Sequence, residues 1–282
     1  MAIDKIIANK DSIYQKYIDK MEGLSVGAQD LFLERVFKIL SKQASKGYLD
    51  KGGKNLAMLN GLFTQLYDAM DDAGMLSEVS NLTRLFDKTL DLNTQIQNYL
   101  SSLDISGLKP TQLQQDFLAN YRNVMFGTPY LSSVLVPIND LLFKAIVSGA
   151  SLAETQSALK TVVGQGKLGA HTIQMTRDAL YGYDGALNQE IVKEYGLNAY
   201  MYVGSIKPGK SSKSGKSKKY ESRPQCVRWV DKNILLKSDL QDEINWAYKH
   251  GSGMIPGTTP DNFPIYRGGY NCRHQAIPTR VK

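Results

Sequence analysis

Apolar residues recur at intervals of three and four through most of the first 195 positions, and this spacing constrains the fold more than any other feature of the chain. The pattern is clearest in the N-terminal segment, at Ile3, Ile6, Ile7, Ile13, Tyr14, Tyr17, Ile18 and Met21. Such intervals place the side chains on one face of an α-helix. Comparable patterns predict helices near residues 28–46, 55–72, 77–103, 111–125, 151–164 and 170–195. The sequence therefore predicts a mainly α protein.

The pattern changes after Gly196. Residues 198–203 are aromatic and β-branched between turn-forming residues, which is typical of a strand. Ser238 with Gln241 marks the start of a further helix that ends near His250. The tail beyond it is rich in glycine and proline. We expect a helical body with a small α+β C-terminal unit that contains short strands and long loops.

Ser106-Gly107 and Pro110 form a cluster of chain-breaking residues between two periodic segments. A domain boundary commonly falls in such a stretch. We therefore expect a helical N-terminal region over residues 1–105 and a second domain over residues 106–282.

Most of the net charge of +7 comes from one loop, at residues 206–220. It carries Lys207, Lys210, Lys213, Lys216, Lys218 and Lys219. No acidic residue lies among them, and without them the chain would be close to neutral. The composition is that of a flexible linker. The loop either contacts phosphate groups, as in nucleic acid, or is a solvated insertion, and the sequence leaves both interpretations open.

No apolar run approaches the 18 residues that a membrane span needs. The best candidate, residues 134–147, is interrupted by Pro137, Asp140 and Lys144. The N-terminus also lacks the apolar core of a signal peptide. We expect a protein that stays in the compartment where it is made and does not contact a membrane.

Two cysteines are too few for a disulfide framework, and residue types suited to metal binding lie near them. Cys272 and His274 are two residues apart, so in an extended segment both side chains lie on one face. Cys226 and His250 could complete a set of two thiolates and two imidazoles, which tetrahedral zinc accepts. One hypothesis is a structural zinc ion; the other is a pair of buried thiols with hydrogen-bonded histidines.

A Cys272–His274 nucleophile pair is a further hypothesis, because Arg273 favours a thiolate beside it. Side chains two apart on a strand are seldom in line for proton transfer, and the sequence offers no clear orienting group. We therefore expect a protein that is not an enzyme.

Three short motifs in the C-terminal part are Tyr202-Val203-Gly204, Arg223-Pro224-Gln225-Cys226 and Asn271-Cys272-Arg273-His274. In type and order they resemble elements of the phage head morphogenesis family, the Mu F-like minor head proteins. Upstream, the segments 148–151 and 172–177 resemble the helical body of that family. The resemblance extends over roughly residues 110 to 282.

The resemblance implies a structural component of the virion, made in the host cytoplasm and placed at the portal vertex inside the head. The implied partners are the portal protein, the major capsid and scaffold proteins, and packaged DNA, which the lysine loop would contact. The implied role is in capsid assembly or in DNA packaging and ejection. The N-terminal 105 residues would then dock to portal or capsid.

Two alternatives belong to other classes of protein. One is a nuclease-like effector, since lysine and histidine can serve phosphodiester cleavage. The other is a DNA-binding protein without sequence specificity, with the lysine loop as its main contact.

Overall fold

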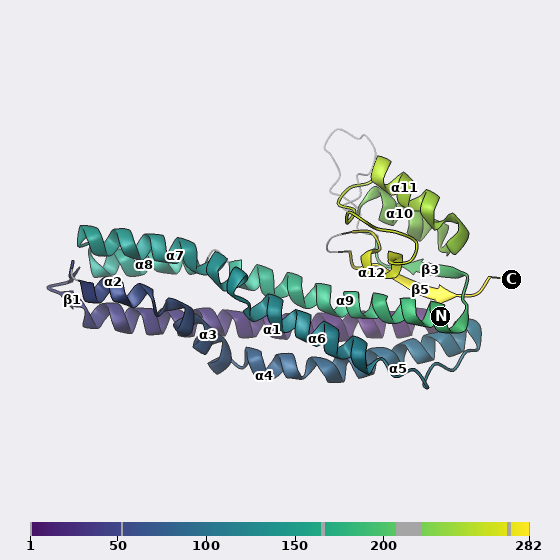
Figure 1. Ribbon diagram of the computed structural model, residues 1–282, viewed down its shortest axis with the longest axis horizontal. Coiled ribbons are helices and arrows are strands. Elements are labelled where there is room, and N and C mark those ends of the chain that lie inside the picture. The colour runs from purple at the N-terminus through teal and green to yellow at the C-terminus, as the bar shows by residue number, and fades with distance from the viewer. Residues whose placement is uncertain (1, 52, 165–166, 207–221, 270–271, 282) are drawn as a thin grey trace. The chain divides into compact units, whose positions relative to one another are not determined.

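A computed structural model of the chain describes residues 2–51, 53–164, 167–206, 222–269 and 272–281. The protein is mainly helical, with small antiparallel sheets of two and three strands, which confirms the predicted fold class. The first half of the chain is formed by α1 (Ala2–Lys42), β1 (Ala44–Ser45), β2 (Tyr48–Leu49), α2 (Gly53–Leu59), α3 (Leu62–Asp72), α4 (Met75–Ser80), α5 (Leu82–Ser101), α6 (Thr111–Phe126) and α7 (Thr128–Ser148). The second half is formed by α8 (Leu152–Gly164), α9 (Lys167–Tyr195), β3 (Ala199–Val203), α10 (Pro224–Lys232), β4 (Ile234–Leu236), a 3₁₀ turn (Lys237–Asp239), α11 (Leu240–His250), α12 (Phe263–Tyr266) and β5 (Gln275–Thr279) (Figure 1).

The chain forms two compact units, and their boundary differs from the predicted one. The first unit comprises Met1–Ser12, Thr83–Phe117 and Arg177–Lys282, and the second comprises Ile13–Leu82 and Leu118–Thr176. Both sides of the Ser106-Gly107 turn therefore lie in the first unit, where the turn merely joins α5 to α6. α1 and α9 each contribute residues to both units without a break in the helix. A helix can do this because its backbone hydrogen bonds join residues four positions apart and need no partner from another element. Chain-breaking residues identified a helix connection here rather than a domain boundary.

A buried polar network holds together the helices of the first unit. The ammonium of Lys10 donates to both carboxylate oxygens of Asp184, at 2.8 and 3.0 Å, and to Asn93 Oδ1 at 2.9 Å. The Asn93 amide also donates to Asp184 and to Asn188, whose own amide donates to the Ala276 carbonyl. Lys10 and Asp184 are fully buried, so each charge depends on the other and on the amides. The network ties α1, α5 and α9 to strand β5.

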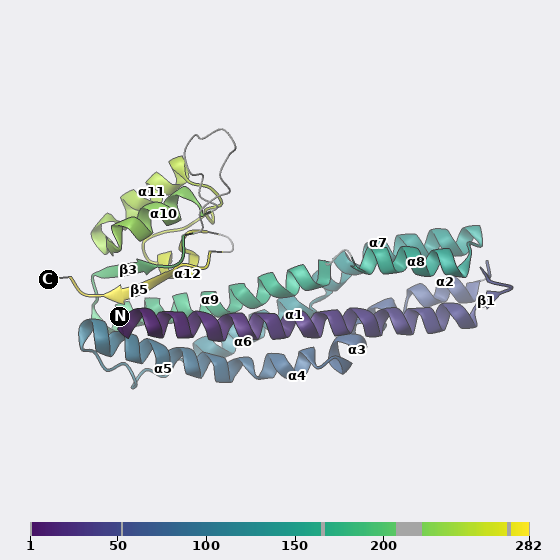
Figure 2. The ribbon, with the colours of Figure 1, turned by 180° about the vertical axis from the view of Figure 1, so that it is seen from behind.

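Strand order in the C-terminal sheet is β4-β3-β5, antiparallel throughout. β3 lies in the centre, and its Tyr202 pairs with Ala276 and its Val203 with Gln275. The underside of β5 packs through Ile277 against Ile7 of α1 and Ile96 of α5. Both views show β3 and β5 beside the start of α1 and the ends of α5 and α9 (Figures 1 and 2). This packing fixes the position of the residues that directly precede β5.

Gly182 and Gly185 weaken the helical pattern of α9, but the helix does not end at either of them. Both glycines lie where other residues pack closely against the helix. A Cβ on Gly185 would lie 2.2 Å from the Pro264 carbonyl oxygen, and one on Gly182 would lie 3.1 Å from the Phe117 ring. α9 therefore continues to Tyr195, and Gly185 lets the backbone of α12 approach the helix. Each glycine lowers the stability of the helix by about 1 kcal/mol relative to alanine. The close packing that the glycine allows offsets this loss.

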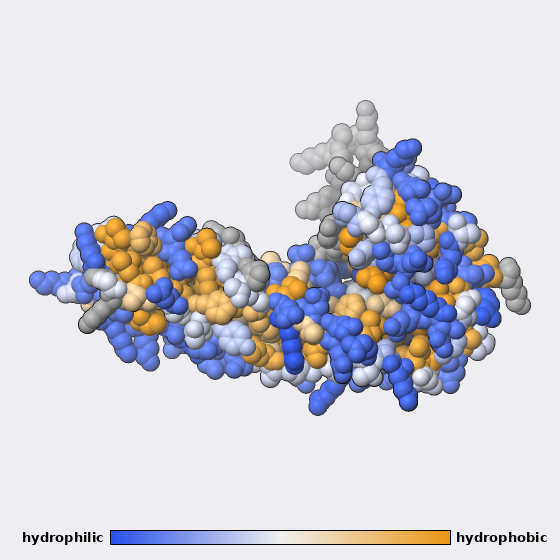
Figure 3. Space-filling view, in the orientation of Figure 1, coloured by the Kyte–Doolittle hydropathy of each residue, from blue (hydrophilic) through white to orange (hydrophobic). Residues whose placement is uncertain are grey.

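The second unit contains a strongly apolar helix, α7. Within Thr111–Ser148 an 18-residue window has a mean hydropathy of 1.5 and is 33% buried. By length and composition this stretch could cross a membrane, but a single such stretch is weak evidence. Figure 3 shows hydrophobic residues gathered over the part of the surface formed by α7 and α8. Val136, Phe143 and Val147 of α7 are each about half exposed.

Candidate metal centre

Residues from three separate segments meet in one buried cluster of the first unit. Cys226 Sγ, from the first turn of α10, lies 4.0 Å from Cys272 Sγ, just before β5. Cys272 Sγ lies 3.5 Å from His274 Nδ1. The Tyr202 hydroxyl, from β3, lies 3.5 Å from Cys272 Sγ and 3.8 Å from Cys226 Sγ. The sequence elements that carry these residues are thus adjacent in space.

The separations within the cluster fit a tetrahedral metal ion. Zinc bonds of about 2.0 to 2.3 Å place neighbouring ligand atoms roughly 3.5 to 3.8 Å apart. The Sγ–Sγ and Sγ–Nδ1 distances of 4.0 and 3.5 Å are close to those values. The ligand atoms of Cys226, Cys272 and His274 all lie within 4.8 Å of one another. Two thiolates and one imidazole are a donor set that selects zinc among common divalent ions.

Gly268 and Gly204 have no side chain, and the cluster occupies the space that a Cβ at either position would fill. A Cβ on Gly268 would lie 2.3 Å from Cys226 Sγ and 2.9 Å from Cys272 Sγ. Gly204 has φ +154°, and a Cβ there would lie 2.4 Å from the imidazole of His274. Any side chain at either position would displace a sulfur or the ring. Gly204 was singled out with the Tyr202 motif, whereas nothing in the sequence pattern indicated a role for Gly268.

The backbone around Gly268 is fixed by side chains from the start of α10. Arg223 Nη1 donates to the Gly268 carbonyl at 2.7 Å, and Gln225 Nε2 donates to the same oxygen at 3.0 Å. Gln225 also bonds to both the carbonyl and the amide of Ser252. The Arg223-Pro224-Gln225-Cys226 motif therefore supplies two donors to the Gly268 carbonyl, Arg223 and Gln225, and one cluster residue, Cys226. Pro224 occupies the first helical position, where its missing N–H costs nothing.

The pKa values of the two thiol groups are shifted in opposite directions. The Cys226 thiol donates toward Cys272, which holds the pKa of Cys272 well below its usual range, with a further contribution from His274. The same interaction, together with burial, raises the pKa of Cys226. Burial raises the pKa of Tyr202, so its hydroxyl stays neutral and can donate to sulfur. A divalent cation that binds both sulfurs would replace the proton between them.

His250 is not part of the cluster, so the predicted set of four ligands is wrong at this residue. It lies exposed at the C-terminal end of α11, with its ring 5.1 Å from that of Trp246. The physical reason lies at the end of α11: Gly251 packs against Gln225 of α10, where a Cβ would lie 2.4 Å from the Gln225 Oε1, and the preceding His250 is left exposed. The fourth polar atom beside the sulfurs belongs to Tyr202 instead.

Several other predicted residues cannot be placed. The lysines of the basic loop (Lys207, Lys210, Lys213, Lys216, Lys218 and Lys219) and Asn271 lie outside the described residues. Arg273 is exposed beside the cluster, between two buried neighbours. This alternation agrees with the prediction that Cys272 and His274 share a face opposite to Arg273.

The cluster is closed to substrates. Cys226, Cys272 and His274 are 3, 6 and 7% exposed, and the ring of His274 is stacked on that of Tyr202 with centroids 5.5 Å apart. A nucleophilic cysteine needs access for its substrate. The arrangement is suited to joining β3, α10 and the segment before β5, and not to covalent catalysis.

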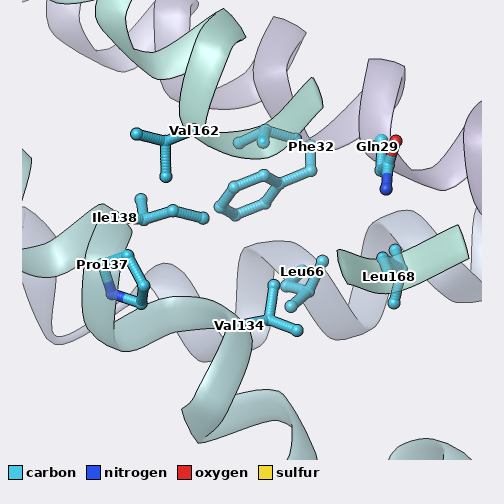
Figure 4. A pocket seen from close by; sticks show the side chains of 9 residues that line it. Gln29, Phe32, Leu66, Val134, Pro137, Ile138, Val162 and Leu168 are labelled. Carbon is cyan, nitrogen blue, oxygen red and sulfur yellow. The ribbon is translucent and has the colours of Figure 1, made fainter. Parts of the chain in front are cut away.

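A separate cavity lies in the second unit, between α1, α3, α7, α8 and the start of α9 (Figure 4). Its volume is about 90 Å³, and its lining is apolar apart from Gln29. Phe32, Leu66 and Ile138 point into it in the close-up. Among the described residues that line it there is no nucleophile, acid or metal ligand, so it offers no chemistry comparable with the cysteine cluster.

Comparison with protein-family models, with curated proteins and with solved structures found no match to this chain.

Proposed function

We propose that the chain is a structural minor head protein of a tailed phage. It would be associated with the portal vertex and the head interior, and would act in capsid assembly or in DNA packaging and ejection. Its partners would be the portal protein, the major capsid and scaffold proteins, and packaged DNA. The proposal rests on the resemblance of three motifs to the Mu F-like minor head proteins.

One observation carries the proposal furthest: the three motifs meet in a single buried cluster. Tyr202, Cys226 and Cys272 are separated by 24 and 46 residues along the chain, yet their polar atoms lie within 4.0 Å of their neighbours. Unrelated short matches would have no reason to converge. Their convergence supports the interpretation that they are parts of one domain signature.

We further propose that the cluster holds a structural zinc ion through Cys226, Cys272 and His274. The ion would cross-link the first turn of α10 to the segment before β5 and would supply no reactive group to a substrate. Tyr202 would stabilise the thiolates by donating its hydroxyl proton toward sulfur. An architectural role agrees with the burial of the cluster.

The role in the virion is tested by the location of the chain. Heads purified from the phage that carries this gene are separated from tails and analysed by quantitative mass spectrometry. We expect the chain in the head fraction at a fixed ratio to the portal protein. A chain found only in the soluble lysate would contradict the proposal.

A second test addresses the portal as partner. The full chain is co-expressed with the portal protein of the same phage, and the complex is isolated through a tag on the portal. Portal rings that carry the chain support the proposal, and rings free of it count against portal association. Metal content, measured separately, bears only on the zinc ion.

A further inference from the structure

Three arginines of the first unit surround Tyr181 on the side of α9 that faces α12 and β5. Arg177 lies one helical turn before Tyr181 on α9, Arg267 follows α12, and Arg273 precedes β5. Figures 1 and 2 both show α12 and β5 beside α9. The close contact of Gly185 with Pro264 fixes α12 against the same helix. Arg177 thus belongs to a helix, whereas Arg267 and Arg273 lie in the connections that follow α12 and precede β5.

Arg267 is the most unusual of the three, because it is a buried cation that has no acidic partner among the described residues. Its side chain is 6% exposed, and its Cζ lies 5.6 Å from the centre of the Tyr181 ring. Nη1 donates to the Tyr181 carbonyl. Nε is buried and finds no hydrogen-bond partner in the described part of the chain. A buried charged donor that lacks an acceptor is costly and calls for an explanation.

Arg177 has the same kind of buried donor as Arg267. Its Nε is also buried, and no described residue accepts a hydrogen bond from it. Burial lowers the pKa of the Arg177 guanidinium, and the positive charge of the nearby Arg273 lowers it further. The like charges of Arg177 and Arg273 repel one another, and an anion bound between them would offset that repulsion.

Two carboxylates lie near the three arginines. Asp178 follows Arg177 in α9 and is exposed. Asp11 is occupied by the Tyr181 hydroxyl and by Gln275, and burial raises the pKa of its carboxyl group. Neither acid is bonded to the unpartnered Nε atoms. The described residues thus leave a surplus of positive charge and two donors directed at no acceptor.

We propose that Arg177, Arg267 and Arg273 form a binding site for a phosphate group. A tetrahedral oxyanion offers several acceptors to planar guanidinium forks, which is why arginine is favoured at such sites. Arg267 supplies a fixed buried donor, Arg177 a second, and the exposed Arg273 the side chain that meets the incoming anion. The site lies outside the basic loop and does not depend on a role in the virion.

The phosphate group can come from free phosphate or from nucleic acid. Titration calorimetry on the full chain measures inorganic phosphate binding at constant ionic strength, in a buffer free of other oxyanions. Arg177→Gln and Arg273→Gln each remove one donor at a position that is not fully buried. We expect each to weaken binding at least about tenfold. Arg84→Gln removes the same charge from an exposed position on α5 of the first unit and should leave binding unchanged.

The source is distinguished with a short single-stranded DNA, with and without a 5′-phosphate, in competition with inorganic phosphate. Competition by both DNAs assigns the site to backbone phosphates, and competition by the phosphorylated DNA alone assigns it to a terminal phosphate. Binding of inorganic phosphate without competition assigns it to the free anion. Each of these supports the site if Arg177→Gln and Arg273→Gln weaken the binding at least about tenfold. Absence of phosphate binding, or equal binding by both variants and Arg84→Gln, overturns the proposal. Circular dichroism of every variant confirms that the helices remain folded.

Discussion

Cys226 Sγ lies 4.0 Å from Cys272 Sγ although 46 residues separate them in the sequence. One thiol belongs to the first turn of α10 and the other to the segment before β5, and Gly268 leaves the space between them. Both segments are held from outside the cluster, the first through α11 and the second through β3. The pair is therefore pre-positioned, and a metal ion would bind with little rearrangement.

Zinc content is the first prediction. Purified full-length chain should contain about one zinc ion per molecule by elemental mass spectrometry. Cys226→Ser and Cys272→Ser should each lose it, because a hydroxyl replaces a thiolate ligand. His250→Ala is the matched control, since this exposed histidine is outside the cluster, and it should retain the ion. Loss of zinc in His250→Ala, or none in the unaltered chain, would contradict the assignment.

The space at Gly268 gives the second prediction. Gly268→Ala would place a Cβ 2.3 Å from Cys226 Sγ and should destabilise the protein by about 1 to 3 kcal/mol. Denaturant unfolding measures the change. Gly23→Ala is the control, because a Cβ at this position of α1 meets nothing within 4 Å, and alanine should stabilise the helix by about 0.5 to 1 kcal/mol. Equal effects of the two substitutions would argue against close packing at the cluster.

The buried pair of the first unit gives the third prediction. Lys10→Met leaves the Asp184 carboxylate buried without its cation, which should cost about 3 to 5 kcal/mol of unfolding free energy. Lys10→Met with Asp184→Leu removes both charges and should recover most of that loss. Lys5→Met, at an exposed position of α1, should change stability little. A double variant as unstable as the single one would contradict this expectation. It would mean that the buried amides of Asn93 and Asn188 depend on the Lys10 and Asp184 charges for their hydrogen bonds.

Glu243 gives a prediction about pH. Hydrogen bonds from Arg228, with others from Lys232 and Trp229, hold the pKa of Glu243 down to about 2. A carboxyl group whose pKa is lower in the folded state stabilises the fold fully above its unfolded pKa, near 4.5, and less as pH falls toward 2. Stability should thus fall over that window. Glu243→Gln should flatten this part of the profile, and Asp242→Asn, at the exposed neighbouring position, should not.

Much of the fold could be predicted because it depends on local periodicity. The strand at 198–203 corresponds to β3, and the helix predicted from Ser238 corresponds to α11. α10 was not predicted: it is only nine residues long, and its cysteine suggested a motif rather than a helix. The predicted domain boundary differs from the two observed units because α1 contributes residues to both of them, and no local pattern in the sequence indicates this.

The candidate site was predictable only in part. Cys272 and His274 were assigned to one face from their spacing, and the structure places both in the cluster with Cys226. The failure at His250 has a tertiary cause, since His250 is the exposed last residue of α11, and a single sequence does not reveal whether the end of a helix packs against a site or faces solvent. The place of the Tyr202 hydroxyl beside the sulfurs depends on the register of β3 with β5, which a single sequence does not reveal.

The basic loop at residues 206–220 gives the last prediction, and it separates DNA contact from nuclease activity. Replacing its six lysines with glutamine should weaken binding to any DNA sequence alike. It should also reduce the slope of log affinity against log salt by about 0.9 for each phosphate that a lysine no longer neutralises. Fluorescence anisotropy at several salt concentrations measures both effects. The same labelled DNA, and RNA, should remain uncut, because the buried His274 cannot reach a phosphodiester. Cleavage that disappears in His274→Ala would favour the nuclease alternative over an architectural protein, since histidine would then be acting as an acid or base.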